Sequence, residues 1–463
     1  MSTLGNESRD GFTSRFGIIC AAAGSAIGLG NIWRFPYVAG ESGGGAFLLI
    51  YLAFILMLGI PVMLSEFIIG RRGQRNALGS FKRLAPGTPW YLVGVMGIVA
   101  AFMILAFYST IAGWTLEYIV KSVSNAFAGK STGEIEGMFV EFHTQALRPI
   151  IWQVVFLFMT LWIIMSGVRK GIERYAKVLM PFLVLLLVIM AIRSITLPGS
   201  AEGLKFLFRP DFSAVNADVL LAALGQAFFS LSIGMGTLIT YGSYIQKKNK
   251  LGNIAIEVSL ADTMIAILAG VAIFPAVFAF GVDPAGGPGL IFNVLPGIFQ
   301  QMPGGYFFAV LFFVLLAIAA LTSSISILEV VVAYLTEELN LTRRKATIMA
   351  AAAATFVGIF CTLSFGPLQN FTIGGRIFFD VLDFTASSLL LPLGGLLIVV
   401  FVGWYMKDLD VKDELSNKGM IKVRIFGILM FLLKFVGPIA IALILLNSLG
   451  IIGGADAGTE HSD

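Results

Sequence analysis

Charged side chains are scarce in this sequence. Asp, Glu, Lys and Arg make up only 13% of its 463 residues, whereas about 25% is usual in a soluble globular protein. Hydrophobic residues make up 57%, and the mean hydropathy is +0.90. Such a chain has too few polar side chains to cover a water-soluble fold, so its composition predicts a polytopic membrane protein.

Residues for redox, metal or nucleophilic chemistry are also few, with two Cys and two His. Cys20 and Cys361 stand in apolar segments, where buried small hydrophobes are expected in place of a disulfide or a metal pair. An intramembrane hydrolase would need a His base beside its nucleophile, and no His falls in an apolar segment. We therefore expect no enzyme.

Apolar runs of about 20 residues, long enough to cross a bilayer, occur eleven times. They are 14–37, 45–70, 90–121, 150–168, 175–196, 217–243, 253–281, 305–335, 346–363, 374–405 and 425–449. The polar start and the lack of a cleavage site argue against a removed signal peptide. We expect an all-α protein with eleven transmembrane helices.

Lys and Arg predict the orientation of these helices, because cytoplasmic loops are enriched in them. Most of the 31 basic residues fall on the cytoplasmic side if the N-terminus is inside. An odd number of helices then places the C-terminus outside. The basic excess therefore reports topology, and no nucleic acid partner is expected.

The first apolar run is interrupted by glycines and polar residues at 24–37, GSAIGLGNIWRFPY. Unpaired backbone groups in lipid cost several kcal/mol each. An unwound stretch is therefore tolerable only where it lines a cavity and polar groups bind its carbonyls and amides. The pattern predicts a binding site made of backbone groups.

A second interruption follows half a chain later, at 225–244, with Ser230, Ser232, Gly234 and Gly236. Either stretch alone could reflect small residues packing between helices. Two such breaks at corresponding places favour an inverted repeat with a site between its halves. We expect repeats at 1–196 and 197–405, followed by an added helix and external tail at 406–463.

Ionisable groups inside a membrane are costly, and each suggests a function. The candidates are Glu66, Asp262, Glu329 and Asp383. Asp262 has no basic residue in the following 80 positions, so it should stay protonated or be balanced by a cation. The alternative is a neutral Asp hydrogen-bonded within a helix interface.

Hydroxyl and charged groups suggest further contacts. Thr322, Ser323 and Ser324 could supply hard oxygen ligands for a cation, or could bond back to their own helix. Arg34 and Asp383 fall near external ends of their helices, where they could close over a substrate or snorkel separately.

With these residues assembled, the chain closely resembles the neurotransmitter:sodium symporter family, in its bacterial amino-acid branch. The resemblance covers residues 8 to about 449. Its motifs are AxGxAxGLGNxxRFPY at 22–37, ESGGGAF at 41–47, KGIERYAKxxMP at 170–181 and ALTSS at 320–324. It implies a 5+5 inverted-repeat transporter with discontinuous helices 1 and 6.

The resemblance also implies two sodium sites and a substrate site. The first sodium site would use Ala26, Asn31, Ser230 and Asp262, and the second Gly24, Ile27, Ala319, Thr322 and Ser323. The substrate would contact Gly24, Ala26, Gly28, Gly30, Ile104, Tyr108, Phe229, Ser230, Ser232, Met235, Ser324 and Ile327. Tyr108 could equally be a lipid-facing or core aromatic.

Gates and a hinge are implied in the same way. Phe229 and the pair Arg34–Asp383 would close the outer gate. Arg9 would pair with Glu337 at the inner gate, with Tyr244 nearby. Gly171 and Pro181 would let the fifth helix unwind.

The expected function is sodium-coupled import of hydrophobic L-amino acids by alternating access, in a bacterial cell membrane. Many family members have Asn where this chain has Asp262, and a fixed carboxylate there predicts chloride independence. Many relatives have twelve helices, and the missing twelfth helix puts a dimer interface like theirs in doubt, so we expect a monomer or a weak homodimer.

Two rival functions remain. One is a carrier of small amines, which typically has Asp on its first helix where this chain has Gly28. The other is a sensor that binds a ligand without translocating it.

Overall fold

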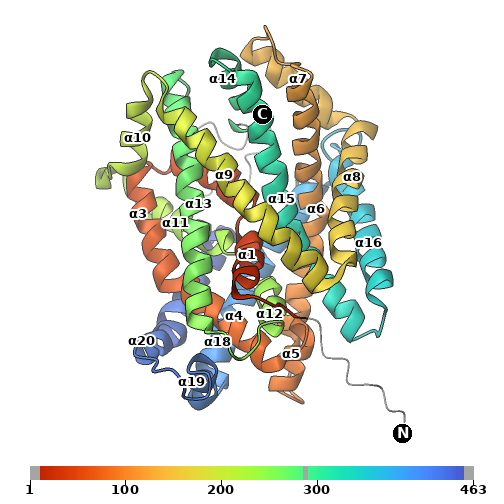
Figure 1. Cartoon of the computed structure of the whole chain (residues 1–463), viewed down its shortest axis with the longest axis vertical. Helices are drawn as coiled ribbons and strands as arrows, with labels where there is room; N and C mark the ends of the chain where they lie inside the picture. Colours follow the sequence, from red (N-terminus) through yellow and green to blue (C-terminus); the bar gives the residue numbers. More distant parts are fainter. Residues whose placement is uncertain (1–10, 285–289, 453–463) are drawn as a thin grey trace.

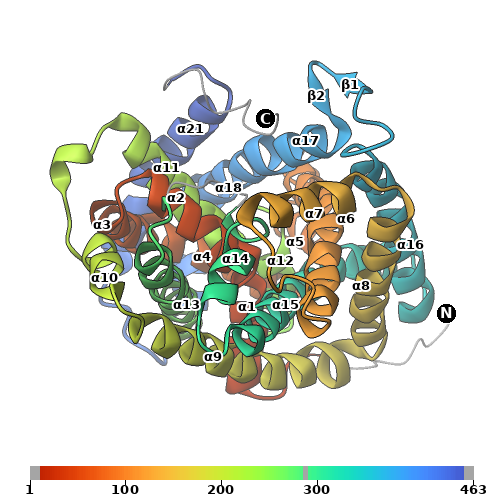
Figure 2. The ribbon, with the colours of Figure 1, turned by 90° about the horizontal axis from the view of Figure 1, so that it is seen from above.

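The computed structural model describes residues 11–284 and 290–452. They form a bundle of mostly upright helices (Figure 1) with one short hairpin (Figure 2). From above, α1 (Arg15–Ala26) and α12 (Thr237–Ser243) lie near the middle, inside a ring of longer helices (Figure 2).

Nine helical segments in the described residues are long and apolar enough to cross a membrane. Several combine an α-helix with a π-helical turn. They are Gly45–Gly73 (α3, Gly45–Phe54; η2, Ile55–Gly59; α4, Ile60–Gly73), α6 (Tyr91–Val123), α8 (Leu147–Met165), Val168–Ile195 (η3, Val168–Glu173; α9, Arg174–Ile195), α13 (Leu251–Ala279), α15 (Gly305–Glu337), α16 (Arg343–Leu363), Phe378–Tyr405 (α17, Phe378–Asp383; η6, Phe384–Leu390; α18, Leu391–Val400; η7, Phe401–Tyr405) and Phe426–Ser448 (α20, Phe426–Phe431; η8, Leu432–Val436; α21, Gly437–Ser448).

A tenth span is counted if α1 and the segment Gly30–Glu41 are taken together. That segment is the π-helical η1 (Gly30–Arg34) followed by α2 (Phe35–Glu41). The remaining predicted span, 217–243, consists of α11 (Ala217–Ser230) and the short α12, which fall below the length of a spanning helix. Eleven spans therefore remain a prediction.

Shorter elements connect these helices. They are α5 (Ala77–Leu84), α7 (Thr132–Thr144), α10 (Ser200–Phe208), the 3-10 turn η4 (Phe212–Ala214), α14 (Leu295–Gln301), α19 (Asp408–Leu415) and the antiparallel strands β1 (Thr372–Ile373) and β2 (Arg376–Ile377). In the hairpin, Thr372 pairs with Ile377 and Ile373 with Arg376.

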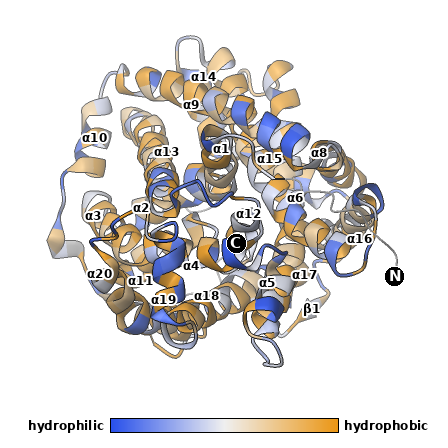
Figure 3. Ribbon diagram, turned by 60° about the horizontal axis from the view of Figure 1, so that its bottom comes forward, coloured by the Kyte–Doolittle hydropathy of each residue, from blue (hydrophilic) through white to orange (hydrophobic). Residues whose placement is uncertain are grey.

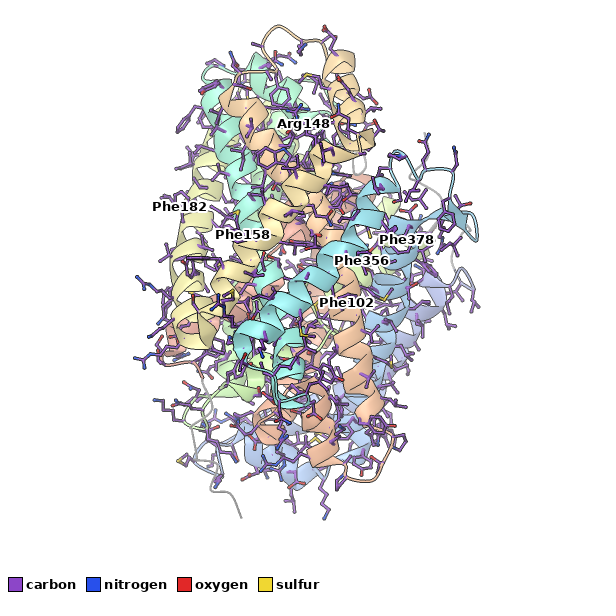
Figure 4. All side chains as sticks on the ribbon, turned by 90° about the vertical axis from the view of Figure 1, so that its right-hand side faces the viewer. Phe102, Arg148, Phe158, Phe182, Phe356 and Phe378 are labelled. Atoms are coloured by element: carbon purple, nitrogen blue, oxygen red, sulfur yellow. The ribbon has the colours of Figure 1, made fainter. Side chains whose placement is uncertain are left out.

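The flank of the bundle is apolar and its ends are polar. Phe158, Phe182 and Phe356 point outward from α8, α9 and α16 (Figure 4), and each is exposed. Hydrophilic residues gather at the bottom end (Figure 3). In the centre, 78% of the most apolar window of α15 is buried within the protein. This distribution matches a bundle whose flank contacts lipid and whose core holds the site.

Candidate functional site

The predicted break in the first helix is confirmed. Helix α1 ends at Ala26 and η1 begins at Gly30, with a bend of 55° between the two halves. Gly28 packs tightly against α15, because a Cβ there would lie 2.4 Å from the Ser323 hydroxyl and would force that side chain to shift. The break therefore brings backbone groups against α15.

The second predicted break is also present, between Ser230 and Thr237. Gly234 and Gly236 adopt positive φ angles of 91° and 76°, which favour glycine. The Gly234 amide donates to Oε1 of Glu66 at 2.7 Å. Unwinding leaves this amide without a partner in its own helix, and the Glu66 carboxylate accepts its hydrogen bond instead. A specific role of this kind is expected for an ionisable residue buried in a membrane protein.

Asn31, Ser230 and Asp262 meet beside both breaks and are fully buried. Asn31 Nδ2 donates to Asp262 Oδ1 at 2.8 Å and to Ser230 Oγ at 3.1 Å. Ser230 Oγ donates to Asp262 Oδ2 at 2.8 Å. Three of the four residues predicted for the first sodium site therefore lie in one hydrogen-bonded cluster.

The residues predicted for the second sodium site also converge. Ser323 Oγ lies 3.3 Å from the carbonyl oxygens of both Gly24 and Ile27. Thr322 Oγ1 lies 3.0 Å from the carbonyl of Ala319 and 3.5 Å from that of Ile27. Hydroxyl and carbonyl oxygens of this kind suit a hard cation. Within residues 11–284 and 290–452, no group of three or more His, Cys, Asp or Glu side chains is placed so that it could hold a metal ion.

A cavity of about 260 Å³ opens beside these clusters. Among the predicted residues, Gly30, Tyr108 and Phe229 line it, together with the predicted gate residues Arg34 and Asp383. The Leu29 amide donates to the Tyr108 hydroxyl at 3.4 Å. The Arg34 guanidinium lies 4.9 Å from the centre of the Phe229 ring. Phe229 and Arg34 therefore stand together in this cavity.

The other residues predicted for the substrate side chain do not line this cavity. Ile104, Met235 and Ile327 are buried. The Ser324 hydroxyl lies 2.8 Å from Thr160 Oγ1 on α8 and donates to the Leu321 carbonyl. The described cavity thus has Phe229 in its wall, and the other residues predicted to contact the substrate side chain lie outside its lining.

The predicted inner gate is only partly described. Arg9 lies outside the described residues. Glu337 accepts a hydrogen bond from the Asn76 amide at 2.7 Å. The Tyr244 hydroxyl donates to Glu329 at 2.7 Å, and Arg343 pairs with the same carboxylate at 2.6 Å. Glu329, predicted only as a buried ionisable group, therefore accepts a hydrogen bond from Tyr244.

The predicted hinge residues lie on the helix that covers the second cluster. Gly171 is in η3, where a Cβ would lie 2.2 Å from the Ile163 carbonyl, and Pro181 is inside α9. A Cβ on Gly24 would lie 3.2 Å from Met180 Sδ. Helix α9 therefore packs directly against the break in the first helix.

Two polar residues at the site were missed in the sequence. The Tyr51 hydroxyl on α3 lies 3.3 Å from Ser230 Oγ and 3.4 Å from Asp262 Oδ2. Gln226 on α11 accepts from Arg34 at 2.5 Å and donates to the Gly30 carbonyl at 3.2 Å. An amide within an apolar run could have signalled Gln226, whereas a lone Tyr in such a run resembles a core aromatic.

The fold and site define a class: a polytopic membrane transporter whose site lies between interrupted helices. A family model described as the sodium:neurotransmitter symporter family matches residues 9–136 and 139–452. The chain therefore belongs to this family of sodium-dependent transporters, which are not enzymes, and the predicted family is confirmed.

Individual relatives agree with this assignment. The chain is 42% identical to the uncharacterized sodium-dependent transporter YhdH of Bacillus subtilis, over 95% of this chain and 98% of that protein. It is 38% identical to an uncharacterized sodium-dependent transporter of Haemophilus influenzae, over 96% of this chain and 100% of that protein. The crystal structure of MhsT in complex with L-phenylalanine superposes with a TM-score of 0.87 at 48% identity, covering 95% of this chain and 100% of MhsT.

Proposed function

We propose that this protein imports hydrophobic L-amino acids together with two sodium ions. The carrying observation is the convergence of Thr322 and Ser323 on the carbonyls of the break in the first helix. This oxygen cluster is the proposed second sodium site, formed by Gly24, Ile27, Ala319, Thr322 and Ser323. Because its ligands come from two separate helices, sodium would favour one arrangement of the helices over another.

The substrate carboxylate is proposed to bind at Gly28 and Gly30, near the Leu29 amide and the Tyr108 hydroxyl. A Cβ on Gly28 would lie 3.2 Å from that hydroxyl, so glycine at this position lets the Tyr108 hydroxyl lie close to the backbone of the break. Free amides at helix ends favour an anion. This arrangement supports an amino acid over a simple amine.

The side chain of the substrate is proposed to lie among Ile104, Phe229, Ser232, Met235, Ser324 and Ile327. Apolar residues dominate this set, and Met adapts its shape to different partners. MhsT, which carries L-phenylalanine in its crystal structure, supports a hydrophobic substrate. Carbonyls near Gly24, Ala26 and Ser230 would receive the amino group.

The first sodium site is proposed at Ala26, Asn31, Ser230 and Asp262. The donors Asn31, Ser230 and Tyr51 all face the Asp262 carboxylate. A bound anion would be held by the same set of donors, and the carboxylate already supplies the negative charge. This supports the proposal that transport is independent of chloride.

Alternating access is proposed to proceed between two repeats, 1–196 and 197–405, with 406–463 as an addition. Phe229, Arg34 and Asp383 would close the outer side, and Arg9, Glu337 and Tyr244 the inner side. Unwinding between Gly171 and Pro181 would release the second sodium ion, since Met180 packs on Gly24. We place the protein in a bacterial cell membrane as a monomer or weak homodimer, with the N-terminus cytoplasmic and the C-terminus external.

Uptake into proteoliposomes tests this proposal. Radiolabelled leucine, phenylalanine and a small amine are supplied with an inward sodium gradient, with and without chloride. We expect the amino acids to accumulate, to leak out when a sodium ionophore dissipates the gradient, and to do so equally in both anions. Binding without accumulation would identify a sensor, and accumulation of the amine alone would identify an amine carrier.

A further inference from the structure

Residues 406–425 link two membrane-spanning segments at the bottom end of the bundle. The preceding span ends at Tyr405 and the next begins at Phe426. Helix α19 lies in this segment, beside α20 and next to the end of α4 (Figures 1 and 3). The segment therefore lies at the depth where the apolar flank of the protein ends.

The acidic side chains of this segment are held in ion pairs. Arg72 on α4 pairs with Asp410 at 2.5 Å and with Asp413 at 3.7 Å. Glu414 pairs with Arg71 at 2.8 Å, Lys247 at 3.5 Å and Arg72 at 3.6 Å, and Asp408 pairs with Lys434 at 3.1 Å. Every carboxylate of the segment thus has a cationic partner from outside the segment, and Arg72 is shared by three of them.

The basic side chains of the same segment face outward. All five are exposed, and none has an ion pair among the described residues: Lys407, Lys412, Lys418, Lys422 and Arg424. Since the acids of the segment already pair with cations from elsewhere, these five exposed cations are left without a carboxylate partner among the described residues.

Large apolar side chains are interspersed among these cations. Leu409 is 77% exposed, Met420 78% and Ile425 60%. The loop that carries Met420 is closed by hydrogen bonds from the Gly419 amide to Ser416 Oγ and from the Ile421 amide to the Ser416 carbonyl, both at 2.9 Å. These side chains are therefore presented by an ordered loop.

We propose that residues 406–425 form a binding surface for anionic phospholipid headgroups. Cations beside an anionic leaflet and apolar side chains at its acyl boundary act together in interfacial binding. The position of the segment between two spans supplies the contact with the leaflet. The inner ion pairs with α4 then connect that lipid contact to the helix bearing Glu66.

Local lipid composition tests this surface in the full-length protein. Cys20 and Cys361 are both buried, so Met420→Cys provides a reactive site for a fluorophore. The labelled protein is reconstituted in vesicles whose phosphatidylglycerol or phosphatidylcholine carries a headgroup quencher. We expect stronger quenching by phosphatidylglycerol, an effect that weakens at high salt because the charges are screened.

Two double variants, each of which removes two positive charges, test whether the preference for phosphatidylglycerol depends on residues 406–425. Lys422→Gln with Arg424→Gln should reduce the preference for phosphatidylglycerol about tenfold or more. Arg344→Gln with Lys345→Gln, which removes two exposed cations at the start of α16, should leave the preference intact. Equal quenching by both lipids, an equal loss in both variants, or no quenching by either lipid would each overturn the proposal.

Discussion

At the site, glycine residues allow close packing of the helices, and hydroxyl residues supply polar groups. Gly24 and Gly28 lie so close to Met180 and Ser323 that a Cβ would contact either side chain. Such close approach lets the hydroxyls of α15 reach backbone carbonyls of the first helix. The chemistry of the site is therefore set by small side chains beside free backbone groups.

Replacing Ser323 should weaken sodium binding. Its hydroxyl lies 3.3 Å from the carbonyls of Gly24 and Ile27, so Ser323→Ala removes one proposed ligand. A lost polar contact of about 1–1.5 kcal/mol corresponds to roughly a tenfold rise in the sodium concentration for half-maximal uptake. Ser326→Ala is the control, because that hydroxyl donates to the Ser323 carbonyl of its own helix. Similar shifts in both variants would argue against the site.

Replacing Asp262 should create a need for chloride. Asp262→Asn leaves the donors of Asn31, Ser230 and Tyr51 without a negative charge between them. We expect slow sodium-driven uptake in gluconate and recovery in chloride. Glu329→Gln is the control, since that carboxylate bonds Tyr244 and Arg343 elsewhere; chloride should not restore its activity. Rescue of both variants by chloride would contradict the assignment.

At the scale of elements, the interrupted helices are held open by their neighbours. The amide of Gly234 is bound by Glu66 on α4, while a Cβ on Gly234 would lie 2.3 Å from the carbonyl of Leu391 at the start of α18. The break between α11 and α12 is thus enclosed from two sides. Backbone groups that lipid could not satisfy are satisfied by adjacent helices.

Introducing a side chain at this break should disrupt it. Gly234→Ala combines a φ of 91° with a collision against the Leu391 backbone, so we expect a lower thermal midpoint and little sodium-dependent substrate binding. Gly252→Ala on α13 is the control, because beyond the neighbouring backbone of its own helix no atom lies within 4 Å of its Cβ position. Equal thermal midpoints for the two variants would show that the break tolerates a side chain.

At the scale of the whole molecule, ion pairs fasten the bottom end of the bundle. Arg71 and Glu414 are each about 1% exposed and join α4 to α19. Arg71 Nη1 also donates to the Asn249 carbonyl at 2.8 Å. One guanidinium therefore links three segments that are far apart in the chain.

Breaking this buried pair should destabilise the protein strongly. Arg71→Met leaves Glu414 without its main buried partner, which typically costs about 3–5 kcal/mol, and the thermal midpoint in detergent should fall. Adding Glu414→Leu to Arg71→Met should recover part of the loss, because no unpaired charge is then buried. Glu202→Gln, which breaks the exposed pair with Lys205, should change little. An unchanged midpoint in Arg71→Met would contradict this role.

The sequence by itself determined the class of protein and the position of both helix breaks. Membrane composition and glycine interruptions are local properties, since lipid penalises any unsatisfied backbone group wherever it occurs. The motifs also identified the hydroxyls at 322–323, which the structure brings to the break in the first helix. Local patterns therefore located the backbone part of the site.

Only the tertiary structure decided which partners meet across long sequence separations. Tyr51 reaches Asp262, Gln226 reaches Arg34, and Arg71 reaches a carboxylate 343 positions away. A polar residue in an apolar run shows that some partner is needed, because burying it alone is costly. The run does not say which partner, since that depends on how the helices pack against one another.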